Sequence, residues 1–591
     1  MPSRRFLLLP LLLVSFTHAA APDRSPVDLA LSPDGRWLVS ANETSDSISL
    51  LDTQTNTVAD EAKCGRRPAA VAIGPAGKTV LVSGAHSGDV SLLEISAGKL
   101  LPQAVIEVGF EPHGIAFAPD GKKAYVALEA NAQVAEIDLE KRKVARRFDV
   151  KRWPRRLAVT PDGKRLAVGC SGDETIVVVD TQSGETLYQQ RVIAAVNFGH
   201  MQMDRAGKYV YFPWMIYRNF PVTRFNITQG WVLASRIARL KMDGPNPHEK
   251  FSLDPRGKAI ADPHGIALNA DETRLVATAS GTHELLVYRL KDLPFRDFGA
   301  TSDHIDRRLL GDSDRFSRIP LGGRPMAVRF APDGKTVYVA NYLKNSVQIV
   351  DILQREILQE IPLGGSPEAS LARRGAAIFY DGQRSLNQWY SCHSCHYNGG
   401  SNSRPMDTMN DGSQFTAKTV LPLDRVQHTA PWTWHGWQQD LRAAMHKSLR
   451  DTMLGPTPQE NDAEALLAFL GSLKQPPNPF REKDGSMTAA ALRGKAICHA
   501  AKAGCASCHN GPQFTDGKIH DVGTGSEEDK YQGYNTPSLI GVHRKVRLLH
   551  HGRGRSLEAV LNKYHRPENV AGEGKLSEQE TRDLIEYLKS L

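Results

Sequence analysis

Residues 28–58 read DLALSPDGRWLVSANETSDSISLLDTQTNTV, the first copy of a repeat that decides how this chain of 591 residues folds. In this copy a short apolar strand meets a Pro-Asp-Gly turn, and an alternating strand, a polar turn and a third strand follow. Proline presets φ and glycine permits positive φ, so the turn has a physical cause. The unit is therefore expected to be a set of short strands joined by tight turns.

The same pattern recurs along the first 360 residues. Further copies lie at residues 70–100, 114–144, 156–186, 200–214, 265–290 and 327–357. The turn prolines of the first four copies are spaced 42, 44 and 42 residues apart, at Pro33, Pro75, Pro119 and Pro161. Four strands per unit of this length are typical of a β-propeller blade, and seven blades close a ring without exposed sheet edges.

The most complete copy, APDGKTVYVANYLKNSVQIVD at 331–351, resembles the YVTN-type propeller family, whose pattern is PDGkxxYVaN…sVsviD. The resemblance implies an all-β, seven-bladed propeller over residues 22–362. It implies no particular function.

Three histidines lie near strand starts that are expected to line the central channel: His113, His200 and His264. Converging imidazoles can hold a metal, although a single histidine per blade also serves as a hydrogen-bonded structural residue. Insertions at 215–231 and 293–320 are expected either to form one functional face or to fill a gap against the next domain.

Beyond the repeats, Cys and His occur together in two C-x-x-C-H motifs, the first within NQWYSCHSCHYNGG at 387–400. Two thiols separated by two residues reach the two vinyl groups of one haem, and the adjacent histidine becomes the proximal iron ligand. A zinc knuckle needs two more ligands nearby, and a thioredoxin-like motif does not need the histidine. The motifs comprise Cys392, Cys395 and His396, and Cys505, Cys508 and His509. They predict two covalently attached c-type haems, with His393 at the surface between the first two thiols.

The C-terminal region also repeats itself. Arg374–Ile378 precedes the first motif as Arg493–Ile497 precedes the second. Each half ends in a segment whose apolar residues follow one helical face, Leu466, Leu467, Leu470 and Leu473 in the first and Leu584, Ile585, Leu588 and Leu591 in the second. We therefore expect a mainly α, duplicated class I cytochrome c-like domain, with halves at 363–480 and 481–591.

The sixth iron ligand would decide what each haem does, and in cytochromes c it is usually a methionine before the terminal helix. Met453 is the favoured candidate in the first half, where His428, His435, Met406 and Met409 compete. No methionine follows His509, so the second half offers other candidates. These are Tyr564, His565, His550 and His551.

Residues 508–523, CHNGPQFTDGKIHDVG, and 534–564 resemble the bacterial di-haem cytochrome c peroxidase and MauG-like family. The first half matches less closely, in TAPWTWHGWQQDLRAAM at 429–445, with His435 where the family usually has Asp. The resemblance implies a peroxide-dependent oxidoreductase that passes electrons between two haems. It also makes His428, His435 and Tyr564 candidate catalytic residues.

Family peroxidases place the peroxide-reactive haem in the first half and the methionine-ligated haem in the second. Met453 and the missing second methionine favour the reverse order, or a MauG-like Tyr/His second haem. Trp432, Trp434 and Trp437 lie between the motifs, where they can carry an electron or pack against a haem face.

Two other functions compete with the peroxidase. One is a di-haem electron-transfer protein without peroxidase activity, whose propeller binds a partner. The other is catalysis in the propeller itself, with the haem domain as an electron outlet. For the peroxidase and for the electron-transfer protein, the expected redox partner is a small cytochrome or a cupredoxin. The sequence does not indicate an oligomeric state.

The first 21 residues place Arg4 and Arg5 before an apolar run, followed by small residues, as in a bacterial signal peptide. We expect a periplasmic protein without a membrane span. The formal net charge is +8 with no block of Lys and Arg, which argues against nucleic acid as a partner. Cys64, Cys170 and Cys498 lie outside the motifs and are expected to be free thiols.

Overall fold

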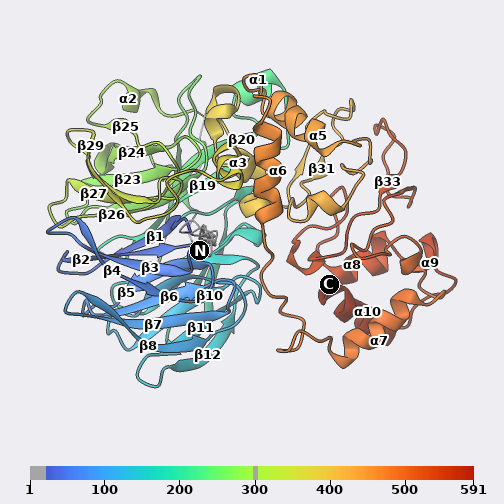
Figure 1. Cartoon of the computed structure of the whole chain (residues 1–591), viewed down its shortest axis with the longest axis horizontal. Coiled ribbons are helices and arrows are strands. Elements are labelled where there is room, and N and C mark those ends of the chain that lie inside the picture. Colours follow the sequence, from blue (N-terminus) through green and yellow to red (C-terminus); the bar gives the residue numbers. More distant parts are fainter. Residues whose placement is uncertain (1–21, 246, 297–303) are drawn as a thin grey trace, which may run out of the picture.

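The computed structural model describes residues 22–591 except residue 246 and residues 297–303, so the expected signal peptide at 1–21 lies outside the described residues. A ring of β-sheets forms the N-terminal part, and a mainly helical region covers one side of it (Figure 1). Within the described residues no helix is long and apolar enough to cross a membrane.

Seven antiparallel sheets follow one another along the chain, which confirms the predicted seven-bladed propeller. Six sheets pair four consecutive strands: β1 (Pro26–Leu31), β2 (Trp37–Asn42), β3 (Ser47–Asp52), β4 (Thr57–Lys63); β5 (Pro68–Ile73), β6 (Thr79–Gly84), β7 (Asp89–Ser96), β8 (Lys99–Glu107); β9 (Pro112–Phe117), β10 (Lys123–Leu128), β11 (Gln133–Asp138), β12 (Lys143–Asp149); β13 (Pro154–Val159), β14 (Arg165–Cys170), β15 (Thr175–Asp180), β16 (Thr186–Arg191); β22 (Pro263–Leu268), β23 (Arg274–Ala279), β24 (Glu284–Arg289), β25 (Phe316–Pro320); β26 (Pro325–Phe330), β27 (Thr336–Asn341), β28 (Ser346–Asp351), β29 (Glu356–Pro362). The fifth sheet has five strands: β17 (Ala195–Val196), β18 (Gln202–Met203), β19 (Tyr209–Tyr217), β20 (Leu233–Lys241) and β21 (Glu249–Ser252).

The apolar cores of the ring lie between neighbouring sheets. One cluster joins Val39 and Ile48 of the first sheet to Val71 and Val80 of the second. Alternating strands supply these residues, because every second side chain points to the same face. The innermost strand of each regular blade is its first, and all six of these strands begin with proline. A proline at a strand start loses no ladder hydrogen bond.

Side chains close the ring between the last and first blades. Arg329 of β26 pairs with Asp28 of β1 at 3.2 Å. The Asn345 side-chain oxygen accepts from the backbone amides of Arg24 and Ser25, each at 3.0 Å. The N-terminal segment is therefore tied to the last blade by hydrogen bonds and an ion pair.

The insertion in the fifth blade carries α1 (Arg224–Thr228) and contacts the helical region. The Val222 amide donates to the Asp407 carbonyl at 2.8 Å, and the Asn387 side chain donates to Thr228 at 3.3 Å. Of the two expectations for this insertion, the structure supports the filling of a gap against the next domain. Part of the sixth-blade insertion lies outside the described residues.

The helical region consists of two halves with matching elements. The first holds α3 (Leu371–Phe379), α4 (Cys392–Cys395), α5 (Leu441–Lys447) and α6 (Asp462–Ser472), and the second holds α7 (Ala489–His499), α8 (Leu557–Ala559), α9 (Pro567–Val570) and α10 (Glu578–Lys589). Short strand pairs complete them: β30 (Pro405–Met406) with β31 (Lys418–Thr419), and β32 (Ile519–His520) with β33 (Tyr534–Asn535). In both halves a π-helical turn, Ser448–Thr452 or Val560–Tyr564, directly follows the middle helix.

The first and last helices of each half cross at a glycine. A Cβ on Gly375 of α3 would lie 1.8 Å from the Ala465 carbonyl oxygen of α6, and one on Gly494 of α7 would lie 1.9 Å from that of Asp583 in α10. These glycines belong to the repeated Arg-Gly segments of the sequence. The duplication thus preserves a contact between two helix backbones.

Candidate haem sites

The first C-x-x-C-H motif forms the short helix α4, which is anchored to the propeller. Asp262, which directly precedes β22, is buried and accepts from the hydroxyls of Ser391 and Ser394 at 2.5 and 2.6 Å. These two serines flank and separate the thiols Cys392 and Cys395. The propeller therefore fixes the backbone that carries the first motif.

His396 follows α4 and presents one nitrogen for a ligand. Its Nδ1 lies 2.9 Å from the Leu421 carbonyl oxygen, which can only accept, so Nδ1 carries the proton. Burial lowers the pKa of His396 to about 4, so the ring is neutral and Nε2 keeps its lone pair. This is the tautomer that a metal-ligating histidine needs.

The second motif repeats this arrangement. Its thiols lie in and after the turn Cys505–Ser507, and His509 Nδ1 lies 3.2 Å from the Phe514 carbonyl oxygen. Burial again lowers the pKa, to about 4 for His509. Both motif histidines therefore offer a neutral Nε2.

Each of these histidines borders a cavity. The first cavity, of about 330 Å³, is lined by His396, and the second, of about 170 Å³, by Cys505, Cys508 and His509. The second is surrounded mostly by apolar side chains, as small-molecule sites usually are. The two cavities share Thr419, Val420, Leu421, Trp434, Lys545 and residues 535–538 as a common wall.

His393 does not lie at the surface, which corrects the expectation from the sequence. It is buried at 5% exposure, and its ring contacts Tyr380 and Tyr397 with centroid distances of 5.2 and 4.8 Å. The loop that carries the first motif packs on the propeller, so the position between the thiols faces an interface.

The candidate ligands of the first half divide between the cavity and its surroundings. Met453 is buried with its sulphur 3.8 Å from Cys392 Sγ, and it does not line the cavity. Met406 lies 3.3 Å from Cys395 Sγ and lines the cavity, as does Met409. His428 is exposed and does not line the cavity, although its neighbour Thr429 does. His435 lines the cavity, and its Nδ1 lies 2.8 Å from the Gly533 carbonyl oxygen.

In the second half, His550 and His565 line the cavity, whereas Tyr564 and His551 do not. Burial lowers the pKa of His550 to about 3 and also lowers that of His565. His565 Nδ1 is buried without a hydrogen-bond partner among the described residues. Tyr564 is half-buried against His551, with ring centroids 5.8 Å apart.

Several lining residues were not among the sequence candidates. They are Met445 in the first cavity, His520 and Tyr534 in the second, and Lys545 in both. Met445 follows Leu441 in the first half at the same distance as Leu561 follows Leu557 in the second, and both Met445 and Leu561 line a cavity. The internal repeat of the sequence could therefore have identified Met445 as a lining residue.

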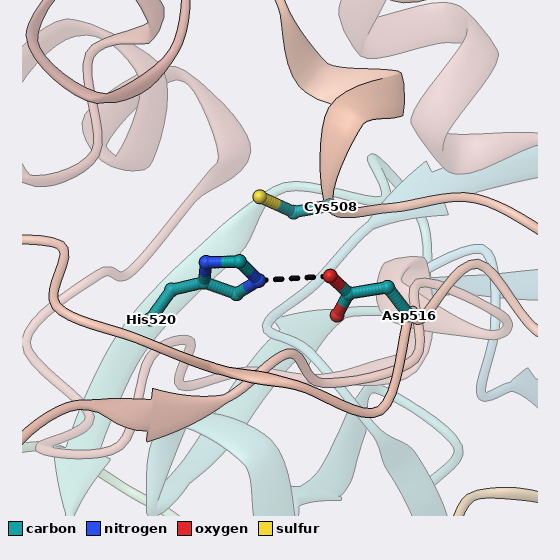
Figure 2. Close-up of side chains that lie close together, drawn as sticks. All are labelled: Cys508, Asp516 and His520. Atoms are coloured by element: carbon teal, nitrogen blue, oxygen red, sulfur yellow. Dashed lines mark hydrogen bonds and ion pairs between the residues drawn. The ribbon is translucent and has the colours of Figure 1, made fainter.

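Cys508 has two further polar neighbours, Asp516 and His520 (Figure 2). His520 Nε2 lies 2.8 Å from Asp516 Oδ2. Burial raises the pKa of Asp516, but hydrogen bonds from His520 and the Lys518 amide outweigh it and hold the pKa below its usual value. A thiol, an imidazole and a carboxylate within 4.8 Å of one another would suit a transition metal. The same thiol belongs to the second motif, so a separate metal site here would compete with haem attachment.

Aromatic side chains connect the two cavities. Trp434 lines both and donates from Nε1 to the Thr419 carbonyl at 2.7 Å, whereas Trp432 and Trp437 line only the first. Tyr534 stacks on His435 at 4.8 Å and on His550 at 3.8 Å between ring centroids. Of the three tryptophans, Trp434 is therefore the one placed to carry an electron between the two cavities.

The propeller histidines do not form one cluster. His200 and His264 are neighbours with ring centroids 4.8 Å apart, and Arg156 Nη2 lies 2.9 Å from His264 Nε2. His113 instead pairs with Glu129 at 2.9 Å. All seven cysteines are free thiols, with Cys170 and Cys498 buried and Cys64 partly exposed.

Comparison with known proteins supports both parts of the architecture. A family model described as "Lactonase, 7-bladed beta-propeller" matches residues 12–104. A solved structure, Kuenenia stuttgartiensis Hydrazine Synthase, superimposes with a TM-score of 0.51 at 24% identity, over 57% of this chain and 98% of that one. This likeness concerns the fold.

Three curated proteins are similar in sequence. Hydrazine synthase subunit gamma of Kuenenia stuttgartiensis is 28% identical over 277 residues, which cover 38% of this chain and 78% of the relative. Methylamine utilization protein MauG of Methylorubrum extorquens is 34% identical over 152 residues, 22% of this chain and 42% of the relative. Hydrazine synthase subunit beta of Kuenenia stuttgartiensis is 28% identical over 196 residues, 30% of this chain and 47% of the relative.

The match thus spans less than half of the length of MauG and of the beta subunit. The resemblance to MauG-like proteins predicted from the sequence is nevertheless confirmed. The chain combines a seven-bladed β-propeller with a mainly helical region, and it is similar to MauG and to subunits of hydrazine synthase.

Proposed function

We propose that this chain is an exported di-haem c-type oxidoreductase that uses hydrogen peroxide, with the propeller as a docking platform for a protein. The observation that carries this proposal is the duplicated geometry of the motifs. Both motif histidines donate Nδ1–H to a backbone carbonyl and keep a neutral Nε2 beside a cavity. The basic and apolar first 21 residues support export to the periplasm.

The residues around the cavities fit haem. The thiols of each motif would form the thioether bonds, and His396 and His509 would be the proximal ligands. Bound haem would supply an iron that exchanges single electrons and, with an open coordination position, reacts with peroxide. Leu539, Val542 and Leu548 line the second cavity and keep water from it.

Trp434 and Lys545 are the side chains that would act on both haems. Trp434 would hold the two cavities at a fixed separation through its hydrogen bond to Thr419 and provide an aromatic ring between them. Two of the relatives are named as subunits, which supports a protein partner for the propeller. A reduced small cytochrome or cupredoxin is the proposed electron donor.

The proposal is tested with exported, haem-loaded chain and a reduced small cytochrome. We expect two covalent haems per chain in the pyridine haemochrome assay and oxidation of the donor only when peroxide is present. Two haems with donor oxidation independent of peroxide would favour the alternative, an electron-transfer protein without peroxidase activity. His435 at the first cavity and His550 and His565 at the second support this alternative, because they place further imidazoles beside the motif histidines.

Lys545 is expected to pair with haem propionates. Lys545 lines both cavities, and its side chain has no hydrogen bond or ion pair among the described residues, although the Asp424 carboxylate acts on it from a longer distance. Burial lowers the pKa of Lys545, and a carboxylate at this point would offset that burial. Lys545→Met should lower the midpoint potential of one or both haems, because a positive charge near a haem stabilises its reduced form.

The expected shift is on the order of 70 mV, for a unit charge about 10 Å away at an effective dielectric constant near 20. Spectroelectrochemical titration measures it. The exposed Lys575, in the same half, provides the control Lys575→Met, which should leave both potentials in place. Equal potentials in all three proteins would exclude Lys545 as a propionate partner.

Met453 and Met445 are tested as sixth ligands of the first haem. Replacing a methionine ligand by leucine should remove the sulphur–iron absorption band and lower one potential. Met453→Leu tests the candidate favoured by the sequence, and Met445→Leu tests the cavity-lining methionine at the position that matches Leu561 of the second half. If neither variant changes the spectrum or a potential, the sixth ligand is not one of these methionines.

A further inference from the structure

A third cavity, of about 130 Å³, lies at the mouth of the propeller channel and is here named the axial cavity. Six of the seven blades contribute residues near the starts of their innermost strands, and the first haem-binding loop covers it. Its lining includes Arg156, His264, Arg324 and His393. At about 30 Å³ per water, its volume holds roughly four waters or one small polyatomic ion.

Positive charge is in excess around the axial cavity. Six cationic side chains and four carboxylates line it. Three of the carboxylates pair with arginines: Glu129 with Arg155 at 2.6 Å, Glu43 with Arg67 at 2.9 Å, and Glu111 with Arg544 at 3.3 Å. The fourth, Asp424, accepts a hydrogen bond from Gln475.

Two guanidinium groups remain without a carboxylate within 4 Å in the described part of the chain. Arg324 lies over the Tyr380 ring, with its Cζ 3.4 Å from the centroid. Arg156 is buried at 9% exposure and contacts the uncharged His264. A buried cation is costly unless an anion compensates it.

The buried polar atoms that lack partners are donors. Arginine can only donate, so His264 Nε2 accepts from Arg156 and the His264 proton sits on Nδ1. Burial, together with the Arg156 charge, holds the pKa of His264 well below its usual value, so the ring is neutral. His264 Nδ1 and Arg156 Nε are both buried without a hydrogen-bond partner among the described residues.

His393 adds a third donor. Its Nδ1 accepts from the Asn398 amide at 3.1 Å, so its proton sits on Nε2, for which no acceptor occurs among the described residues. Burial holds the pKa of His393 well below its usual value, and Arg324 contributes. Arg156, His264 and His393 thus line one cavity, and in the described part of the chain Arg156 Nε and His264 Nδ1 are buried donors without a partner.

We propose that the axial cavity binds a small inorganic oxyanion between Arg156, His264, Arg324 and His393. An oxyanion accepts several hydrogen bonds and compensates two guanidinium charges, which water alone does not. A cation is disfavoured: Glu111, His113 and Glu129 have donor atoms within 4.8 Å of one another, but Arg155 occupies both oxygens of Glu129.

The position of the site gives it a consequence for the first haem. His393 lies between Cys392 and Cys395, so an anion bound here adds negative charge beside the first motif. Negative charge stabilises the oxidised iron, so binding should lower one midpoint potential. This consequence rests on the proposed function, whereas oxyanion binding does not.

The test is isothermal titration of the haem-loaded full chain with sulfate, in a buffer whose only other anion is the bulky MES. We expect one saturable site per chain. Arg156→Gln and Arg324→Gln should each weaken binding at least about tenfold, because each removes one charged partner of the oxyanion. The exposed propeller residue Arg142 donates to the Gln103 carbonyl at 3.3 Å and does not line the axial cavity, so Arg142→Gln is the control and should bind as the wild type does.

If one variant misfolds by circular dichroism, the other still tests the site. Absence of saturable binding by the wild type to sulfate, phosphate and nitrate in turn would overturn the proposal. Equal affinity in Arg156→Gln, Arg324→Gln and the wild type would overturn it as well. A chain that binds sulfate but carries no haem would support the axial site and contradict the proposed function. Failure of the oxyanion proposal can therefore be told apart from failure of the proposed function.

Discussion

Replacing Cys505 and Cys508 together by alanine is expected to leave one covalent haem per chain and to abolish peroxide-dependent oxidation of the donor. In the proposed protein these two thiols would form the thioether bonds of the second haem, and His509 alone would hold haem only reversibly. The reciprocal pair Cys392→Ala with Cys395→Ala should remove the other haem. Intact mass spectrometry counts the covalent haems, and stopped-flow absorbance follows donor oxidation.

Activity should be lost in both double variants, because the proposed reaction needs electrons to pass between the haems. The control is Cys64→Ala: this thiol is partly exposed, donates to the Gly65 carbonyl at 3.5 Å, and packs on the apolar core of the first two blades, away from both motifs. It should keep two haems and full activity. Two covalent haems in either double variant, or undiminished donor oxidation, would contradict the assignment of the motifs.

Gly494→Ala is expected to destabilise the second half by about 1–3 kcal/mol, although the same change in an open helix stabilises by about 1 kcal/mol. The added methyl group would lie 1.9 Å from the Asp583 carbonyl oxygen, so the two helix backbones must separate. Gly375→Ala should have the same effect in the first half. The sign of the change in the free energy of unfolding therefore shows whether backbone crowding or helix propensity dominates at these glycines.

Urea unfolding followed by near-ultraviolet circular dichroism measures this loss. Ala496 is exposed in the same helix as Gly494, so Ala496→Leu adds volume without a backbone contact and should change the free energy of unfolding by less than about 0.5 kcal/mol. A Gly494→Ala chain as stable as the wild type would mean that α7 and α10 do not cross as closely as described.

The sequence predicted the propeller and the two haem motifs because both are encoded locally. Pro-Asp-Gly turns in four copies, related turns in the other three and alternating strands specify the blades, and the motif spacing specifies which thiols and histidine act together. The repeated Arg-Gly segments marked the duplication, although only the helix crossing explains why Gly375 and Gly494 occur in both.

Contacts between the two domains could not be read from the sequence. His393 was expected at the surface because it lies in the loop between the two thiols, but its ring packs against Tyr380 and Tyr397, and distant propeller residues lie opposite it. Asp262 and Arg324 each directly precede the proline that starts an innermost strand, and Glu111 does the same in the third blade. These residues could have been identified from the sequence by their shared position directly before this repeated proline.

The distal side of each haem depends on contacts across the cavity rather than on order along the chain. Met453 occupies the expected sequence position, yet its sulphur lies beside Cys392, whereas Met445 lines the cavity. Lys545 follows a turn without a motif and still borders both cavities. Tyr564, His551 and His428 remain predictions that the lining of the cavities does not favour.

The most direct test of the proposed peroxidase is the reaction of the half-reduced protein with hydrogen peroxide, followed by stopped-flow absorbance and electron paramagnetic resonance. We expect one haem to be high-spin and to react rapidly, and the other to supply an electron through the wall that contains Trp434. Two low-spin haems that stay inert to peroxide in every redox state would contradict it and identify the chain as an electron carrier.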